Sequence, residues 1–165
     1  SALQAILIAL ALVLIYITFR FQWRQGIAAI ITLLHDVMVV VGIFSIFDKE
    51  FTLPVIAALL TVVGYSLNDT IVIFDRIREN ISKFRKRELL PLINQSVTET
   101  LSRTLLTSGT TLMVVLALVF LGGEIIHDFA FALLVGVLIG TYSSIYVASP
   151  TVLWLTKIAP PKTSD

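Results

Sequence analysis

Three ionisable side chains interrupt runs of sequence that are otherwise apolar. They are Asp36, Asp69 and Arg103, and each lies in a different run. Moving a charged group from water into an apolar environment is unfavourable unless the charge is paired or neutralised. Ionisable residues in such runs are therefore typical of ion or proton pathways. The sequence predicts a proton relay with Asp69 and Arg103 as its principal pair and Asp36 as a further relay candidate.

Polar residues accompany Asp69 and Arg103 on one face of their predicted helices. At about 100° per residue, Tyr65, Asn68 and Asp69 fall within about one third of the circumference. A matching polar stripe runs through the segment that holds Arg103, and its members are Thr100, Arg103, Thr107, Thr110 and Thr111. We expect the two faces to meet, because the offset of about 6 Å between Asp69 and Arg103 is one that an arginine side chain can cross.

Each candidate also has a purely structural interpretation. Arg103 lies near a predicted helix end and can reach lipid headgroups without any partner. Asp69 can be a static buried carboxylate that holds helices together. For Asp36, which follows His35, a second station of the relay and a structural polar pair facing the bundle interior are equally compatible with the sequence.

Other kinds of site have little support in the sequence. His35 is the one histidine inside an apolar run and no HExxH pattern occurs, so we expect no metal and no cofactor. An aspartyl protease would need Asp36 and Asp69 at one depth, whereas their positions predict different depths. A nucleophilic Ser108 would lack a histidine base. We therefore set these enzymatic interpretations aside and expect a proton-transport step and not an enzyme.

Five predicted membrane-spanning helices would position these residues. The chain has 165 residues, of which 57% are hydrophobic and 14% charged, against about 25% charged in a soluble domain. Five runs approach the length of about 20 mostly apolar residues that a spanning helix needs. The runs are 2–19, 27–47, 52–74, 101–121 and 129–156. The predicted fold is an all-α, polytopic membrane helix bundle, with residues 1–165 as a single transmembrane domain.

The basic residues predict the orientation of these spans. Ten of them fall in alternate connectors and the tail, namely Arg20, Arg24, Arg76, Arg78, Lys83, Arg85, Lys86, Arg87, Lys157 and Lys162. The opposite side has Lys49 alone, so the positive-inside rule places the third connector and the C-terminus in the cytoplasm. Within that connector, about residues 76–100, apolar residues at helical spacing predict an amphipathic helix at the inner headgroup layer, and a solvated linker is the alternative for its first half.

Small residues recur every fourth position in the last predicted span. Ala132, Gly136, Gly140, Ser144 and Ala148 form this row, which allows a neighbouring helix to approach closely and favours packing within the chain over a specific dimer. Pro150 follows, and it removes a backbone donor to Tyr146, so a kink is expected near the inner end of this helix.

Charge and cysteine content limit the partners and the context. Lys and Arg total 12 against 11 Asp and Glu, so no excess of positive charge indicates a nucleic-acid partner. There is no cysteine, which excludes disulfides and thiolate chemistry. Because the chain starts at Ser1 without a basic segment before its first apolar run, we interpret it as a fragment of a longer protein.

Three long segments resemble a known family. They are "VGYSLNDTIVIFDRIREN" (63–80), "SRTLLTSGTTLMVVLAL" (102–118) and "GTYSSIYVASP" (140–150), and with "LLHDV" (33–37) the resemblance spans almost the whole chain. They are similar to the signature segments of the SecF proteins in the SecD/SecF family of bacterial protein export. The resemblance implies part of a half-unit of the resistance-nodulation-division (RND) architecture, without the first helix and periplasmic domain of SecF.

The resemblance also implies a function, partners and residue roles. It implies an accessory subunit of the Sec translocase in the bacterial inner membrane that, with SecD, uses the proton motive force to assist preprotein translocation. Implied partners are SecD, the SecYEG channel, YajC, YidC, the preprotein and the lipid bilayer. The family's proton-path aspartate and arginine fall on Asp69 and Arg103, whereas Asp36 receives no firm role. Two alternatives stay open: a membrane scaffold that joins SecD to the channel, and a proton-coupled efflux transporter.

Overall fold

Nearly all described residues of the protein belong to helices. A computed structural model describes residues 2–84 and 88–158. Its elements are α1 (Ala2–Arg20), α2 (Trp23–Ile46), α3 (Leu53–Lys83), α4 (Leu89–Leu121), α5 (Glu124–Ser143), the π-helix η1 (Ser144–Ala148) and α6 (Ser149–Ile158). The expected all-α class is confirmed.

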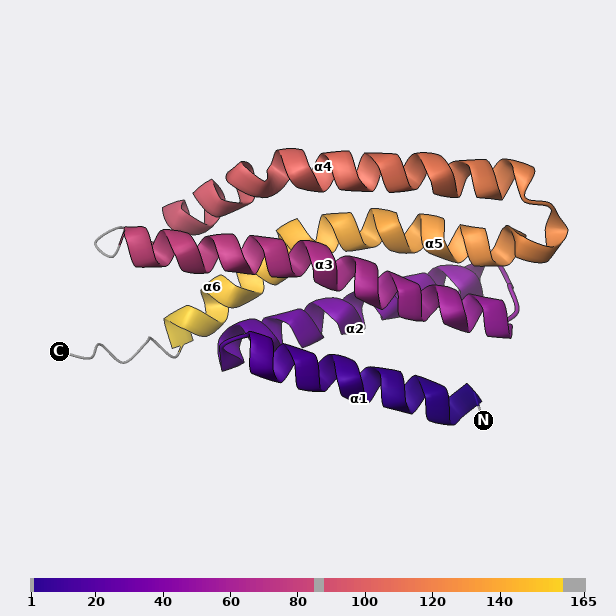
Figure 1. The fold of residues 1–165 in the computed structure, drawn as a ribbon, viewed down its shortest axis with the longest axis horizontal. Helices are drawn as coiled ribbons and strands as arrows, with labels where there is room; N and C mark the ends of the chain where they lie inside the picture. Colours follow the sequence, from indigo (N-terminus) through magenta and orange to yellow (C-terminus); the bar gives the residue numbers. More distant parts are fainter. Residues whose placement is uncertain (1, 85–87, 159–165) are drawn as a thin grey trace.

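Helices α3 and α5 form the centre of the bundle. They make the most extensive helix contact in the molecule, and α4 and α2 pack on this central pair. Figure 1 shows α4 and α1 at opposite edges of the bundle, and α1 touches only α2 and α3 to a substantial extent. The arrangement places residues of α2, α3, α4 and α5 close enough to form shared side-chain clusters.

Four stretches are long and apolar enough to cross a membrane: Trp23–Ile46, Leu53–Lys83, Leu89–Leu121 and Glu124–Ile158. The first expected span corresponds to α1, in which a shorter apolar segment, Ala11–Arg20, is found among the described residues. The protein is therefore a membrane helix bundle. Its helices extend beyond the predicted spans, most clearly in α3 and α4.

The amphipathic helix expected at about residues 76–100 is not a separate element. Helix α3 continues without a break through Lys83, and α4 begins at Leu89 with Pro91 in its first turn, where proline is tolerated. The reason is packing: Ile77 on α3 and Ile93 on α4 are both buried in one hydrophobic core cluster. Four of the basic residues that predict the orientation lie outside the described residues, namely Arg85, Lys86, Arg87 and Lys162.

The last span changes its helical form before Pro150. Residues Ser144–Ala148 adopt a π-helix between α5 and α6, and Figure 1 shows α6 leaving the axis of α5. The Ser149 hydroxyl donates to the Ser144 carbonyl oxygen at 3.4 Å and thereby satisfies an acceptor within the altered turn. A local π-helix is a common cause of a kink, so the irregularity expected near Pro150 is present.

Close approach of α3 and α5 depends on the small residues of α5. A Cβ atom at Gly136 would lie 2.0 Å from Val62 Cγ2, and one at Gly140 would lie 3.2 Å from Ser66 Cβ. The predicted packing face is confirmed, and its contacts lie within the chain. At the start of α5, Gly123 has φ 74°, a conformation that favours glycine and permits the short turn from α4.

Candidate functional site

Asp69 lies inside the bundle with an incomplete set of partners. Its side chain is on α3, the residue is only 4% exposed, and its Oδ2 atom has no hydrogen-bond partner. Buried polar atoms without partners are uncommon in folded proteins and require an explanation. An oxygen in this situation is suited to gaining and losing a proton or to meeting a mobile partner.

Arg103 approaches this carboxyl group without forming an ion pair. It is exposed on α4, and its positive charge acts on Asp69, but no ion pair joins the two residues. Arg103 instead lines a hollow of about 310 Å³ between α3 and α4, together with Val72 and Thr100. The structure therefore brings the predicted pair within electrostatic range and leaves a space between the helices.

The polar stripe predicted on α4 is turned largely away from the bundle. Thr107, Thr110 and Thr111 donate to carbonyl oxygens of their own helix at 2.8 to 2.9 Å. On α3, Asn68 is likewise exposed. The expectation that the two full faces meet is therefore wrong for these side chains, because α4 is rotated so that a neighbouring row of residues is buried.

That buried row of α4 consists mostly of small hydroxyl residues. Ser96, Thr100, Thr104 and Ser108 recur every fourth position and are buried. Ser108 contacts two other helices: it accepts a hydrogen bond from the Tyr65 hydroxyl at 3.0 Å, and its Oγ lies 2.7 Å from Thr141 Oγ1 on α5. Of the predicted supporting residues, Tyr65 thus takes part in a contact between helices.

Asp36 has a fuller set of partners than Asp69. Ser66 on α3 and Ser143 on α5 donate to its Oδ2 atom at 2.5 and 2.9 Å, and His35 Nδ1 lies 3.0 Å from Oδ1. Asp36 is 1% exposed. Its carboxyl group therefore joins α2, α3 and α5 at a level of the bundle between Leu33 and Val40, which belong to separate hydrophobic clusters.

Sequence reasoning missed the hydroxyl residues that complete these clusters. Ser66, Ser108, Thr141 and Ser143 have no individual signal, because serine and threonine often bond to carbonyl oxygens of their own helix. The one available signal was periodicity: Ser96, Thr100, Thr104 and Ser108 repeat every fourth residue. Residues four apart lie on one face of a helix, so this row indicates the face of α4 that packs against its neighbours.

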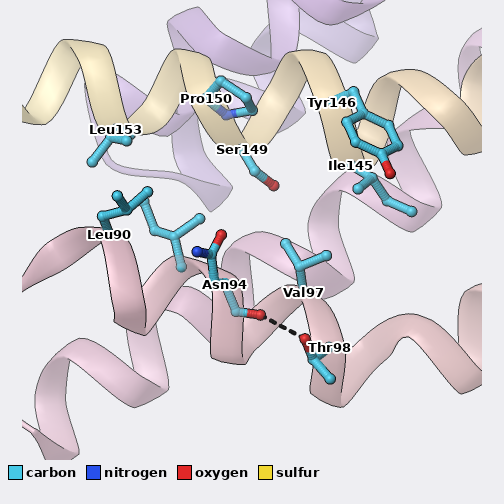
Figure 2. A pocket seen from close by; sticks show the side chains of 10 residues that line it. Leu90, Asn94, Val97, Thr98, Ile145, Tyr146, Ser149, Pro150 and Leu153 are labelled. Carbon is cyan, nitrogen blue, oxygen red and sulfur yellow. Dashed lines mark hydrogen bonds between the residues drawn. The ribbon is translucent and has the colours of Figure 1, made fainter.

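Another hollow lies away from Asp69. It has a volume of about 460 Å³ and separates the first turns of α4 from η1 and α6. Figure 2 shows Asn94 and Ser149 directed into this space from opposite sides, among apolar side chains such as Leu90 and Leu153. The hollow adjoins the irregular turn before Pro150. Within residues 2–84 and 88–158, no group of acidic or histidine side chains has the arrangement of a metal site.

The fold and the site define a polytopic membrane protein with two buried carboxyl groups at its centre. The family model "Protein export membrane protein SecD/SecF, C-terminal" matches residues 1–158. The chain therefore belongs to the SecD/SecF family of protein export membrane proteins, as the sequence resemblance implied.

Characterised relatives agree with this assignment. Protein translocase subunit SecF of Vibrio alginolyticus is 57% identical over 151 residues, which cover 92% of this chain and 48% of that protein. Protein translocase subunit SecDF of Thermus thermophilus is 52% identical over 153 residues, which cover 93% of this chain and 21% of that protein. The chain thus spans about half the length of the SecF relative.

A solved structure has the same fold. A crystal structure of SecDF in the super-membrane-facing form matches with a TM-score of 0.87 and 51% sequence identity. The match covers 94% of this chain and 21% of the solved chain. The helical arrangement described above is therefore that of a segment within a larger SecDF protein.

Proposed function

We propose that this chain is the membrane part of an accessory subunit of the bacterial Sec translocase. In this proposal it acts with SecD and uses the proton motive force to assist preprotein translocation across the inner membrane. Family membership supports a role in protein export. The observation that carries the proton-coupled step is the buried Asp69, whose Oδ2 atom has no partner and which lies within range of the Arg103 charge.

The proposed step is an exchange of partners at Asp69. Burial in a low-dielectric environment favours a neutral carboxyl group, and a nearby arginine favours a carboxylate. When Arg103 stands apart, Asp69 accepts a proton from the outer side. When α4 brings the guanidinium closer, the proton leaves toward the cytoplasm. Motion of α4 relative to α3 is then linked to proton flow, and a bistable helix interface of this kind can drive a larger domain. The step uses no enzymatic chemistry and no cofactor.

The exposed polar side chains of α3 and α4 support a membrane partner. Asn68, Arg103 and Thr110 are exposed at positions inside predicted spans, and contact of such groups with lipid is unfavourable. We propose that SecD covers this face and supplies the rest of the relay. SecYEG, YajC and YidC are proposed as further partners of the complete protein. We also propose that the third connector and the C-terminus lie in the cytoplasm, because most basic residues fall on that side.

The test uses Asp69→Asn in the complete SecDF complex. Preprotein movement is measured in inner-membrane vesicles with and without a proton uncoupler. We expect the variant to lose the uncoupler-sensitive part of the movement, because an amide cannot take up and release the proton. Asp128→Asn is the matched control, since Asp128 is a half-buried aspartate on α5 that pairs with Lys49 and does not line the hollow beside Arg103. Undiminished uncoupler-sensitive movement in Asp69→Asn would refute the relay.

Assembly distinguishes the relay from a scaffold. A scaffold that joins SecD to the channel requires Asp69→Asn to assemble and to work normally. A static Asp69–Arg103 tie requires Asp69→Asn and Arg103→Met to lose assembly singly and to regain it together. Because no ion pair joins these residues in the structure, we expect each single variant to assemble with SecD. An efflux transporter, in contrast, would show uncoupler-sensitive export of small molecules.

A further inference from the structure

Helix α4 is attached to the rest of the bundle through small polar side chains. Four of its seven buried residues are small hydroxyl residues, namely Ser96, Thr100, Thr104 and Ser108, and the other three, Leu92, Ile93 and Val115, are apolar. Small side chains leave shallow ridges, so the resistance of this seam to sliding or rotation comes less from interlocking and more from specific hydrogen bonds. The location of those bonds then decides how α4 can move.

Two hydrogen-bonded clusters hold α4 on either side of Arg103. Toward the start of α4, Asn80 Nδ2 donates to Ser96 Oγ at 2.9 Å. Further along, the Tyr65 hydroxyl donates to Ser108, and Ser108 lies 2.7 Å from Thr141 Oγ1. Between the two clusters no ion pair joins Arg103 to Asp69, and Arg103 lines a hollow between α3 and α4.

The protons of the second cluster point in one direction. Thr141 donates to the Val137 carbonyl oxygen at 2.7 Å, so Ser108 must donate to Thr141, and Tyr65 donates to Ser108. The row ends at an amide carbonyl oxygen, which does not pass a proton onward. Tyr65, Ser108 and Thr141 therefore form a hydrogen-bonded tie between α3, α4 and α5, and they are not a proton wire.

We propose that the Tyr65–Ser108–Thr141 tie is a positioning device that holds α4 in the arrangement in which Arg103 stands apart from Asp69. Tyr65 lies about 6 Å along α3 from Asp69, and Ser108 about 7.5 Å along α4 from Arg103, so the tie acts about one helical turn from the gap. In this proposal Arg103 approaches Asp69 through a shift of α4, and that shift breaks the Tyr65–Ser108 bond. The proposal rests on the proposed function, because it assigns the tie a role in the proton-coupled step.

The tie is tested by measuring closure of the hollow in the complete SecDF complex. This chain has no cysteine, so Val72→Cys and Thr100→Cys introduce a defined pair on opposite walls of the hollow; any cysteines elsewhere in the complex are removed. The rate of oxidative cross-linking reports how often the walls approach. We expect Tyr65→Phe to raise this rate by about threefold to tenfold, the factor that corresponds to losing one net hydrogen bond.

Two further variants sharpen the measurement. Ser108→Ala breaks the same tie, so it is expected to raise the rate similarly, and the double variant is expected to add little to either single change. Tyr142→Phe is the matched control, because Tyr142 is exposed on α5 and stacks on Tyr146 outside the tie. Its cross-linking rate is expected to equal that of the starting protein.

The possible results separate this proposal from the relay. An unchanged cross-linking rate in Tyr65→Phe refutes the positioning role of the tie. If the rate is unchanged while the Tm of the complex falls, the hydrogen bond contributes to stability only, and the positioning role is refuted as well. If the rate rises while Asp69→Asn keeps full uncoupler-sensitive translocation, α4 is held by the tie but the proton relay fails. If Asp69→Asn is inactive and Tyr65→Phe is unchanged, the relay stands without the tie.

Discussion

Asp36 and Asp69 both carry buried carboxyl groups, but they differ in their hydrogen-bond partners and therefore in the roles that we infer for them. Asp36 has donors from α3 and α5 and a histidine beside it, whereas Asp69 has an oxygen without a partner. A buried carboxyl group that accepts hydrogen bonds from neighbouring helices has its oxygens satisfied and is held in place by those helices. We therefore infer that Asp36 is chiefly a junction between helices.

The first prediction concerns the contribution of Asp36 to stability. Asp36→Ala removes the acceptor of two buried hydroxyl groups, and leaving a buried donor without its acceptor costs about 1 to 3 kcal/mol. We expect a loss of about 3 kcal/mol in the free energy of unfolding and a smaller loss in Asp36→Asn, which keeps one acceptor oxygen. Thermal unfolding of the detergent-solubilised complex measures both.

Asp75→Ala provides the comparison for Asp36. Asp75 forms an ion pair with Arg20 at the end of the bundle, and both side chains are more than one third exposed. Exposed ion pairs contribute about 0 to 1 kcal/mol, so this variant is expected to unfold almost as the starting protein does. If instead Asp36→Asn unfolds normally and loses uncoupler-sensitive translocation, Asp36 belongs to the relay and not to the framework.

At the scale of the helices, the sequence predicted where helices occur better than it predicted where they end or which of their faces is buried. Apolar runs indicated the spans, and the four-residue row of small residues indicated the face of α5 that meets α3. The extension of α3 to Lys83 was missed because hydropathy falls at Asp75 even though Ile77 and Asn80 stay buried against α4. The rotation of α4 was missed because threonines fill both its buried row and its exposed row, so residue type could not distinguish them.

The second prediction concerns the α3–α5 contact. Gly136→Ala would place a Cβ atom 2.0 Å from Val62 Cγ2, and overpacking of this kind costs about 1 to 3 kcal/mol. We expect a lower Tm of the complex. Val62→Ala removes the opposing methyl groups and should restore part of the loss in the double variant. Gly42→Ala is the control, because a Cβ there meets nothing within 4 Å; an equal loss in both glycine variants would contradict the close contact.

The third prediction concerns the irregular turn before α6. Pro150 cannot donate a hydrogen bond, and residues Ser144–Ala148 adopt a π-helix directly before it. We expect Pro150→Ala to favour a regular α-helix and thereby to rotate α6 against α4. Spin labels on Leu90→Cys and Trp154→Cys, which are both exposed, report this as a shifted distance distribution. Pro54→Ala, at the start of α3, should leave it unchanged, and an unchanged distribution in Pro150→Ala would show that the turn does not depend on the proline.

Across the whole molecule, charged side chains gather at the two ends of the bundle. At one end Arg20 pairs with Asp75, and Arg76 pairs with Glu99, which links α1, α3 and α4. At the other end Lys49, in the α2–α3 connection, pairs with Asp128 on α5 at 2.5 Å. Such exposed pairs contribute little stability. Their unequal content of basic residues matters more, since it determines how a membrane protein is oriented.

The fourth prediction is the orientation of the bundle in the membrane. Glu50 is exposed in the α2–α3 connection and Ser82 is exposed near the end of α3. Figure 1 shows this connection and the end of α3 at opposite ends of the bundle. Because basic residues cluster at the end that holds Ser82, we expect that end to face the cytoplasm. In intact spheroplasts, a membrane-impermeant maleimide should label Glu50→Cys, whereas Ser82→Cys should react only after permeabilisation. The reverse labelling pattern would show that the topology is opposite to the predicted one. The end of the bundle near the α3–α4 hollow would then face outward, and protons would have to enter the proposed relay from that end.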